Sequence, residues 1–194
     1  MILSYGVTDH FPDLPGFAAC WGKTVVPCPY CHGFEIAGQH WGLLYSSPMS
    51  LHMPPLYNHW TDRITMFTDG HALPDEERAT LAERGVVLVD GKVAAIAHAD
   101  GVLSAVVMAD GRRVDIDTLF AHPRNTPSCN LHAMLDLAMT DTPVGQIVKV
   151  DERQQTSMPG VYAAGDLATG MNSLTIATHA GAMAAIHAQV SLIA

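Results

Sequence analysis

The sequence has 194 residues, of which 48% are hydrophobic and 15% charged, and its formal net charge is -9. This composition excludes a disordered chain, and an acidic chain without a basic cluster is a poor partner for nucleic acid or an anionic membrane. Four cysteines are too few for a disulfide scaffold. The first basic residue is Lys23, so we expect no signal peptide and a cytoplasmic location.

Strand and helix signals alternate over the first half of the chain. Strands are expected over residues 24–26, 41–46, 64–67 and 86–89, a proline-kinked helix over 50–60 and a clear helix over 74–84. Two alternating apolar runs follow, 92–99 and 102–109, and Asp100-Gly101 between them is the strongest short hairpin signal. This order predicts a small α/β domain with an antiparallel appendage.

The remaining segments are less regular. Residues 1–22 read as a short strand and a proline-punctuated loop, and the second half as short strands between loops. We expect strands over 118–121, 147–150 and 161–163, one helix over 130–138 and a final helix from about Ser173. The apolar stretch 174–194 has the length of a membrane span, but its His, Gln, Thr and Ser residues indicate a buried or half-buried helix instead.

A Cys-x-x-Cys pair, Cys28 and Cys31, carries the strongest chemical signal. If Cys28 caps a helix with Pro29 in its first position, then Cys28, Cys31 and His32 lie on one face. Helix amides favour a thiolate, and an adjacent imidazole can hold or deliver its proton. These are the parts that thiol–disulfide exchange needs, so we predict Cys28, Cys31 and His32 as catalytic residues.

Two other interpretations of the pair stay open. It could be half of a zinc site, but Cys20 and Cys129 supply no second Cys-x-x-Cys, so we predict no metal. It could also consist of two inert buried thiols. Cys20 and Cys129 themselves are expected to be packing residues.

Two sequence blocks resemble the FAD-dependent thioredoxin reductases, the class II pyridine nucleotide-disulfide oxidoreductases. Residues 28–35 (CPYCHGFE) are similar to that family's redox-active site, and residues 156–166 (TSMPGVYAAGD) to its C-terminal flavin signature. The run 181–185 (GAMAA) resembles the helix that follows. The likeness covers nearly the whole chain, and His32 in particular is similar to the dithiol oxidases of this superfamily.

The resemblance implies an α/β fold in two parts. Residues 24–117 would form a Rossmann-like three-layer inserted domain, which resembles an NADPH domain, carries the cysteine pair and ends in an antiparallel β-meander. Residues 1–22 and 118–194 would form the C-terminal part of a split FAD-binding domain. The Gly-x-Gly-x-x-Gly half of that domain has no counterpart in this sequence, so the chain resembles a truncated member.

The resemblance also implies roles for individual residues. Cys31 would be the thiol nearest the flavin, Cys28 would exchange with substrate, and Asp166 would bond a ribityl hydroxyl. The cofactor-binding residues would then be Gly165, Asp166, Ser173 and Leu174.

Two departures from the family argue against ordinary NADPH binding. The expected glycine-rich loop after the strand at 41–45 is replaced by residues 46–50 (SSPMS). After the strand ending at Phe67, residues 68–71 (TDGH) carry no basic group for a 2′-phosphate. FAD is therefore the one cofactor that the resemblance supports, and it requires the missing half-domain.

We therefore expect electrons to pass between a substrate dithiol or disulfide, the Cys28/Cys31 pair and FAD. The substrate would be a small dithiol or disulfide, or a protein disulfide. A split domain leaves apolar surface uncovered, so we expect a homodimer or a second chain that supplies the missing FAD half. The alternatives are a flavin-free thiol exchanger and a flavin-free truncated remnant with a binding or assembly role.

Overall fold

The computed structural model describes residues 1–193, which form two compact units. The central unit comprises residues 11–123, and the terminal unit combines residues 1–10 with the chain from residue 124 onward. Each unit has its own sheets and its own core.

The central unit is built on a five-stranded parallel sheet of order β3-β10-β4-β5-β6. Its strands are β3 Val25–Val26, β4 Trp41–Leu44, β5 Ile64–Phe67, β6 Val86–Val89 and β10 Thr118–Phe120. Every residue of β4 and β5 is buried, because a parallel sheet is covered on both faces. The α/β architecture predicted from the sequence is confirmed.

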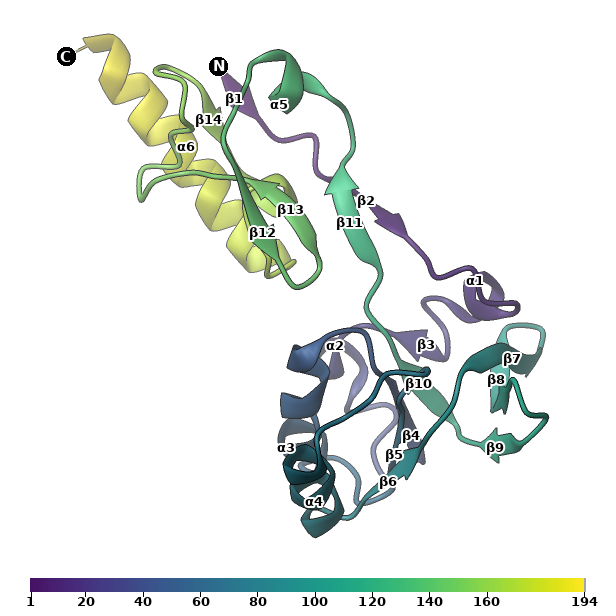
Figure 1. Ribbon diagram of the computed structural model, residues 1–194. Helices are drawn as coiled ribbons and strands as arrows, with labels where there is room; N and C mark the ends of the chain where they lie inside the picture. Colours follow the sequence, from purple (N-terminus) through teal and green to yellow (C-terminus); the bar gives the residue numbers. More distant parts are fainter. Residues whose placement is uncertain (194) are drawn as a thin grey trace. The chain divides into compact units, whose positions relative to one another are not determined.

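Two different layers cover this sheet (Figure 1). Helices lie on one face: α2 Pro29–His32, α3 Pro54–Tyr57 and α4 Asp75–Glu83, with the 3₁₀ turn η1 Pro48–His52. A three-stranded antiparallel sheet lies on the other: β7 Val93–Ala99, β8 Val102–Met108 and β9 Arg113–Asp115. Asp100 and Gly101 both have positive φ, 52° and 81°, as a two-residue hairpin of primed type requires.

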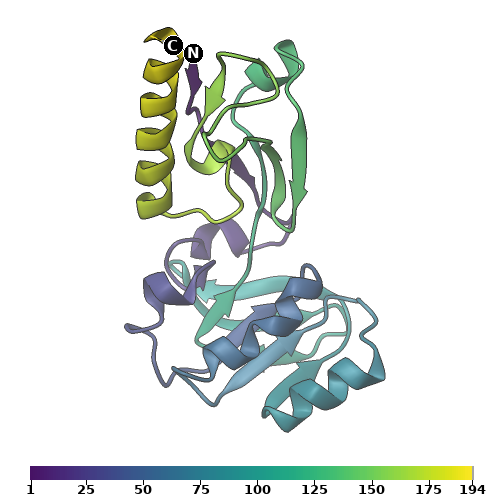
Figure 2. The ribbon, with the colours of Figure 1, turned by 90° about the vertical axis from the view of Figure 1, so that its left-hand side faces the viewer.

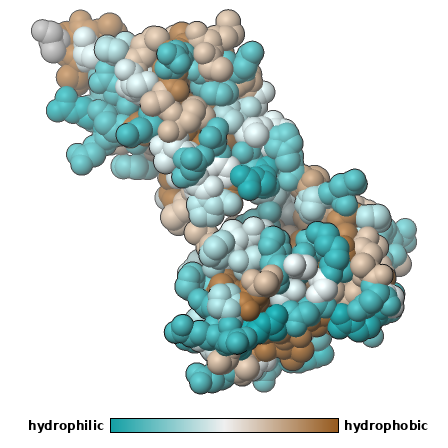
Figure 3. All heavy atoms as spheres, in the orientation of Figure 1, coloured by the Kyte–Doolittle hydropathy of each residue, from teal (hydrophilic) through white to brown (hydrophobic). Residues whose placement is uncertain are grey.

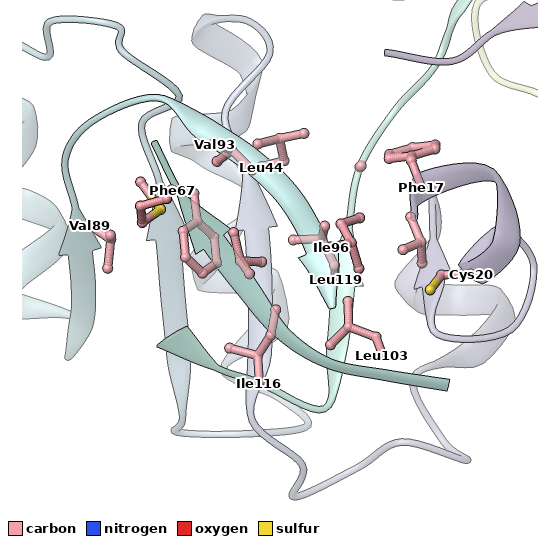
Figure 4. Close-up of a cluster of buried hydrophobic side chains, with 14 residues drawn as sticks. Phe17, Cys20, Leu44, Phe67, Val89, Val93, Ile96, Leu103, Ile116 and Leu119 are labelled. Carbon is pink, nitrogen blue, oxygen red and sulfur yellow. The ribbon is translucent and has the colours of Figure 1, made fainter. Parts of the chain in front are cut away.

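The segment before β3 packs on the central unit. Its helix α1 (Phe17–Cys20) buries Phe17 and Cys20 in one apolar cluster with Ile96 and Leu103 of the hairpin (Figure 4). Gly16 comes so close to this hairpin that an added Cβ would lie 2.2 Å from the carbonyl oxygen of Ile96. The compact unit therefore extends beyond the expected range 24–117 at both ends, since β10 also belongs to its sheet.

The terminal unit contains two sheets and a long helix. Strands β1 Ile2–Leu3 and β14 Tyr162–Ala163 pair in parallel. The second sheet has the order β12-β13-β11-β2 and contains β2 Val7–His10, β11 Arg124–Pro127, β12 Met139–Thr142 and β13 Gly145–Val148. The short elements α5 Leu131–Met134 and η2 Gly165–Leu167 and the helix α6 Leu174–Ile193 complete the unit.

Two expectations for this region were wrong. The helix expected over 130–138 ends after one turn at Met134, and Asp136 has a positive φ of 49° that ends it. Strands β11 (RNTP) and β12 (MTDT) form where no strand was predicted. Their sequences lack the alternation of apolar residues that marks a strand, because few of their side chains enter a core.

Helix α6 runs along β1 and β14 and buries only Ala180 and Ala184 (Figure 2). Most of its apolar side chains are exposed, Leu174 by 86% and Leu192 by 84%. The helix was expected to be buried or half-buried, but only one narrow stripe of its surface is buried. Figure 3 shows apolar surface at the end of the unit where the chain finishes. By length and composition alone, α6 could cross a membrane.

Candidate functional site

The cysteine pair begins the short helix α2 at the carboxyl end of β3. Cys28 is the N-cap residue in extended conformation, with φ -135° and ψ 120°, and Pro29 takes the first helical position. This is the cap geometry that the sequence indicated, because proline has no amide hydrogen to lose there. Cys28 is half-buried, Cys31 is exposed, and both are free thiols.

The two thiols interact directly. A hydrogen bond with Cys28 raises the pKa of Cys31, and burial and the charge of Cys28 raise it further. Cys31 therefore keeps its proton to a higher pH than an ordinary cysteine. His32, half-buried, follows in the same turn.

An aromatic platform supports the helix that carries the thiols. Gly33 lies against Trp60: an added Cβ would come within 2.5 Å of the carbonyl oxygen of Pro29 and 3.0 Å of the Trp60 ring. Tyr30 meets Trp60 edge to face at 5.9 Å between ring centroids. Tyr30 and Phe34 are 77% and 88% exposed, so two exposed aromatic side chains lie within three residues of Cys31 in the sequence.

The residues of the flavin-like signature meet in the terminal unit. Gly165 has φ +72° and opens the turn η2, and its Cβ position would lie 3.9 Å from Ala177 of α6. The turn of Gly165 and Asp166 therefore packs on the beginning of the helix that starts with Leu174, directly after Ser173. All four predicted cofactor-binding residues come from this one corner.

The environment of Asp166 suits a hydroxyl-bearing ligand. Burial raises the pKa of the Asp166 carboxyl, and the negative charge of Asp9 on β2 raises it further. A carboxyl group in such a place is stabilised by O–H donors, and ribityl hydroxyls are donors of this kind. The exposed Leu174 offers an apolar surface to a flat ring. These residues fit the ribityl and ring parts of FAD.

The loops that follow β4 and β5 in the central unit are held by hydrogen bonds within the chain. The hydroxyl of Ser50 accepts the amide hydrogen of Ser46 at 3.2 Å, which closes the loop after β4. After β5, Asp69 pairs with Lys92 at 2.7 Å and accepts the amide hydrogen of Val93 at 2.9 Å.

Sequence reasoning missed several residues near these sites. Trp60 supports the cysteine helix, and Tyr57 packs with Trp60 on the ring of Trp41, yet both residues stand in a stretch without periodicity. The sequence did not indicate a role for Asp9, because Asp166, on which its charge acts, is distant in the sequence. The packing role expected for Cys20 is confirmed, since it is fully buried, whereas that expected for Cys129 was wrong because its side chain is exposed.

Comparison with known proteins yields a consistent set of relatives. The family model described as pyridine nucleotide-disulphide oxidoreductase matches residues 59–184. The thioredoxin reductase tcpT of Claviceps purpurea is 30% identical over all of this chain, and the thioredoxin reductase aclD of Aspergillus oryzae is 27% identical over 96% of it. This chain covers 62% of each of these two relatives, so it spans about three fifths of their length.

Solved structures agree with this assignment. An oxidoreductase from Agrobacterium tumefaciens matches 99% of this chain with a TM-score of 0.90 and 35% sequence identity, over 64% of its own chain. The protein HlmI matches 99% with a TM-score of 0.88 and 30% identity, over 59% of its own chain. The chain therefore belongs to the pyridine nucleotide-disulphide oxidoreductase family, and its relatives are thioredoxin reductase-like.

Proposed function

We propose that this chain carries the thiol-exchanging half of a flavin-linked dithiol/disulfide oxidoreductase. The observation that supports it most is the Cys28/Cys31 pair, two free thiols in the first turn of a helix, of which one is exposed. Inert structural cysteines are buried like Cys20, and no group of three or more potential metal ligands occurs among residues 1–193.

The exchange step needs only residues of the central unit. With the pair oxidised, a substrate thiolate attacks the Cys28 sulfur, the Cys28–Cys31 bond breaks, and Cys31 leaves as a thiolate. The second substrate thiol then attacks the mixed disulfide and frees Cys28. The substrate has lost two electrons and two protons, and the pair has gained the electrons. We assign proton transfer to His32, which follows Cys31 directly.

The exposure of the two thiols is compatible with the roles that the family resemblance implies. Cys31, the proposed thiol nearest the flavin, is exposed, as expected for a residue whose partner surface comes from outside this unit. Cys28 is half-buried and still accessible to a small dithiol. Bound FAD would supply a two-electron acceptor, and Gly165, Asp166, Ser173 and Leu174 would hold its ribityl and ring parts.

We further propose that the chain does not use NADPH in the ordinary way. The loop closed by Ser46 and Ser50 leaves no glycine-rich turn for a pyrophosphate, and Asp69 is acidic where a 2′-phosphate would need a base. The electrons would then pass to oxygen or to another acceptor.

The exposed apolar face of α6 supports a role for a partner. Contiguous apolar surface favours association, and the chain spans only three fifths of its relatives' length. We propose that a second copy or another chain covers this face and completes the flavin site. The same face supports the alternative, a flavin-free chain that acts in binding or assembly.

The deciding experiment measures visible absorption and thiol oxidation together. The purified chain is desalted with and without added FAD, and oxidation of a small dithiol is followed for the chain and its Cys28→Ser variant. Bound flavin with turnover that needs Cys28 supports the proposal. Turnover without flavin indicates a simple thiol exchanger. A colourless protein for which Cys28→Ser and Cys31→Ser change nothing contradicts both and favours the binding role.

A further inference from the structure

Tyr57 at the end of α3 has a buried hydroxyl group that packing alone does not explain. Its side chain is 0% exposed, with ring centroids 5.5 Å from Trp41 and 4.5 Å from Phe120. Its oxygen has no hydrogen-bond partner among the described residues. Buried hydroxyl groups nearly always have a partner, because an unmet one is costly. A phenylalanine would fill the same space without this penalty.

The position of Tyr57 links it to the cysteine pair. Its ring packs on Phe120, and Phe120 pairs with Val26 across β10 and β3. Val26, Phe120 and Tyr57 belong to one buried apolar cluster, and Cys28 follows Val26 by two residues, so Tyr57 packs beside the strand that leads to Cys28. Burial raises the pKa of Tyr57, and the charge of Cys28 raises it further. The phenol therefore stays protonated and can donate a hydrogen bond but cannot act as a base.

We propose that Tyr57 is a positioning residue for Cys28, whose sulfur accepts the Tyr57 O–H when it becomes a thiolate. In this structure both thiols are free and the phenol has no acceptor among the described residues. An ionised sulfur accepts more hydrogen bonds than a neutral thiol and gains most from a donor that water cannot replace. The inference rests on the proposed function, because it assigns a role within the same exchange site.

Few other groups can influence the charge of Cys28. Helix α2 contributes Tyr30, Cys31 and His32, and α3 contributes Tyr57 alone. Strands β3 and β10 contain no titratable residue, and His122 stands two positions after β10. The variant Cys31→Ser removes the Cys31 thiol. Tyr57 and His32 are then the main side-chain donors left for a Cys28 thiolate.

The test compares Cys28 alkylation in the Cys31→Ser chain with and without Tyr57→Phe. Iodoacetamide is applied across a pH series, and mass spectrometry reports each cysteine separately. At neutral pH, Tyr57→Phe is expected to slow Cys28 alkylation by roughly fivefold and to move its midpoint to higher pH, because the thiolate fraction governs the rate. The exposed Cys129 of the terminal unit should react with an unchanged profile. Tyr45→Phe, which removes a half-buried phenol from the same unit, is the matched control.

Two measurements keep the outcome interpretable. Cys20 is fully buried in the central unit, so its continued protection shows that a variant has folded. Difluorotyrosine at position 57, a stronger donor of similar shape, should move the Cys28 midpoint to lower pH. Superimposable Cys28 profiles with tyrosine and phenylalanine at position 57 would overturn the inference. Alkylation requires neither flavin nor turnover, so its result is separate from the outcome for the proposed function.

Discussion

Asp9 of β2 and Asp166 of η2 lie close enough in the terminal unit for their charges to interact. Burial raises the pKa of the Asp166 carboxyl, and the negative charge of Asp9 raises it further. The two residues are far apart in the sequence, and the fold brings both acids to the corner that carries the flavin-like signature. Neighbouring carboxylates repel each other when both are ionised, and O–H donors from a ligand would lessen this repulsion.

Asp9→Asn is expected to stabilise the terminal unit at neutral pH. An acid whose folded pKa lies above its unfolded value opposes folding once it ionises, so its stabilising contribution is present at low pH and is lost as pH rises through the raised pKa. Removing the Asp9 charge should raise the free energy of unfolding at neutral pH by roughly 0.5 kcal/mol. The value is small because solvent screens both groups. Thermal unfolding at pH 4 and pH 7 measures the gain, which should vanish at the lower pH. Asp13→Asn, the same charge change in the central unit, is the control.

The four cysteines should differ sharply in reactivity. Cys28, Cys31 and Cys129 should react with a thiol reagent in the folded protein, whereas Cys20 is 0% exposed and should react only after denaturation. Mild oxidation should join Cys28 to Cys31, since the two residues begin and end one helical turn of α2. Peptide mapping after alkylation checks both points. A disulfide from Cys129 to either member of the pair would contradict this account of the site.

Gly33→Ala should destabilise the helix that carries the cysteines, although the substitution adds only one methyl group. The added Cβ would lie 2.5 Å from the carbonyl oxygen of Pro29 and 3.0 Å from Trp60, and backbone must move to make room. We expect a loss of about 1–3 kcal/mol in the free energy of unfolding and slower disulfide exchange. Gly181→Ala in α6 meets nothing within 4 Å and should be neutral or stabilising. Urea unfolding of both variants gives the comparison.

Phe17→Ala should destabilise the central unit, although Phe17 precedes the first strand of its sheet. The side chain is 1% exposed in the cluster with Cys20 and Ile96, so its loss should cost about 3–5 kcal/mol. Phe11→Ala, in the same segment but 39% exposed, should cost far less. An equally small effect for both variants would mean that residues 11–22 do not belong to this core.

The local signals of the sequence predicted much of the central unit. The β-branched runs at 64–67 and 86–89 became β5 and β6, and Asp100-Gly101 became the hairpin turn with both residues at positive φ. The proline after Cys28 indicated the cap that the structure shows. In each case the relevant interactions lie within a few residues, so a short stretch of sequence contains the information.

The sequence by itself determined the α/β architecture, the position of the cysteine pair at a helix start and the family to which the chain belongs. Only the tertiary structure decided that Tyr57 lies buried beside the strand leading to Cys28, that the charge of Asp9 acts on Asp166, and that α1 belongs to the central core. It also decided that β11 and β12 are strands, since their polar sequences pair with β13 through backbone hydrogen bonds. Contacts between residues far apart in the sequence depend on the path of the whole chain. A local pattern of residue types contains no information about that path.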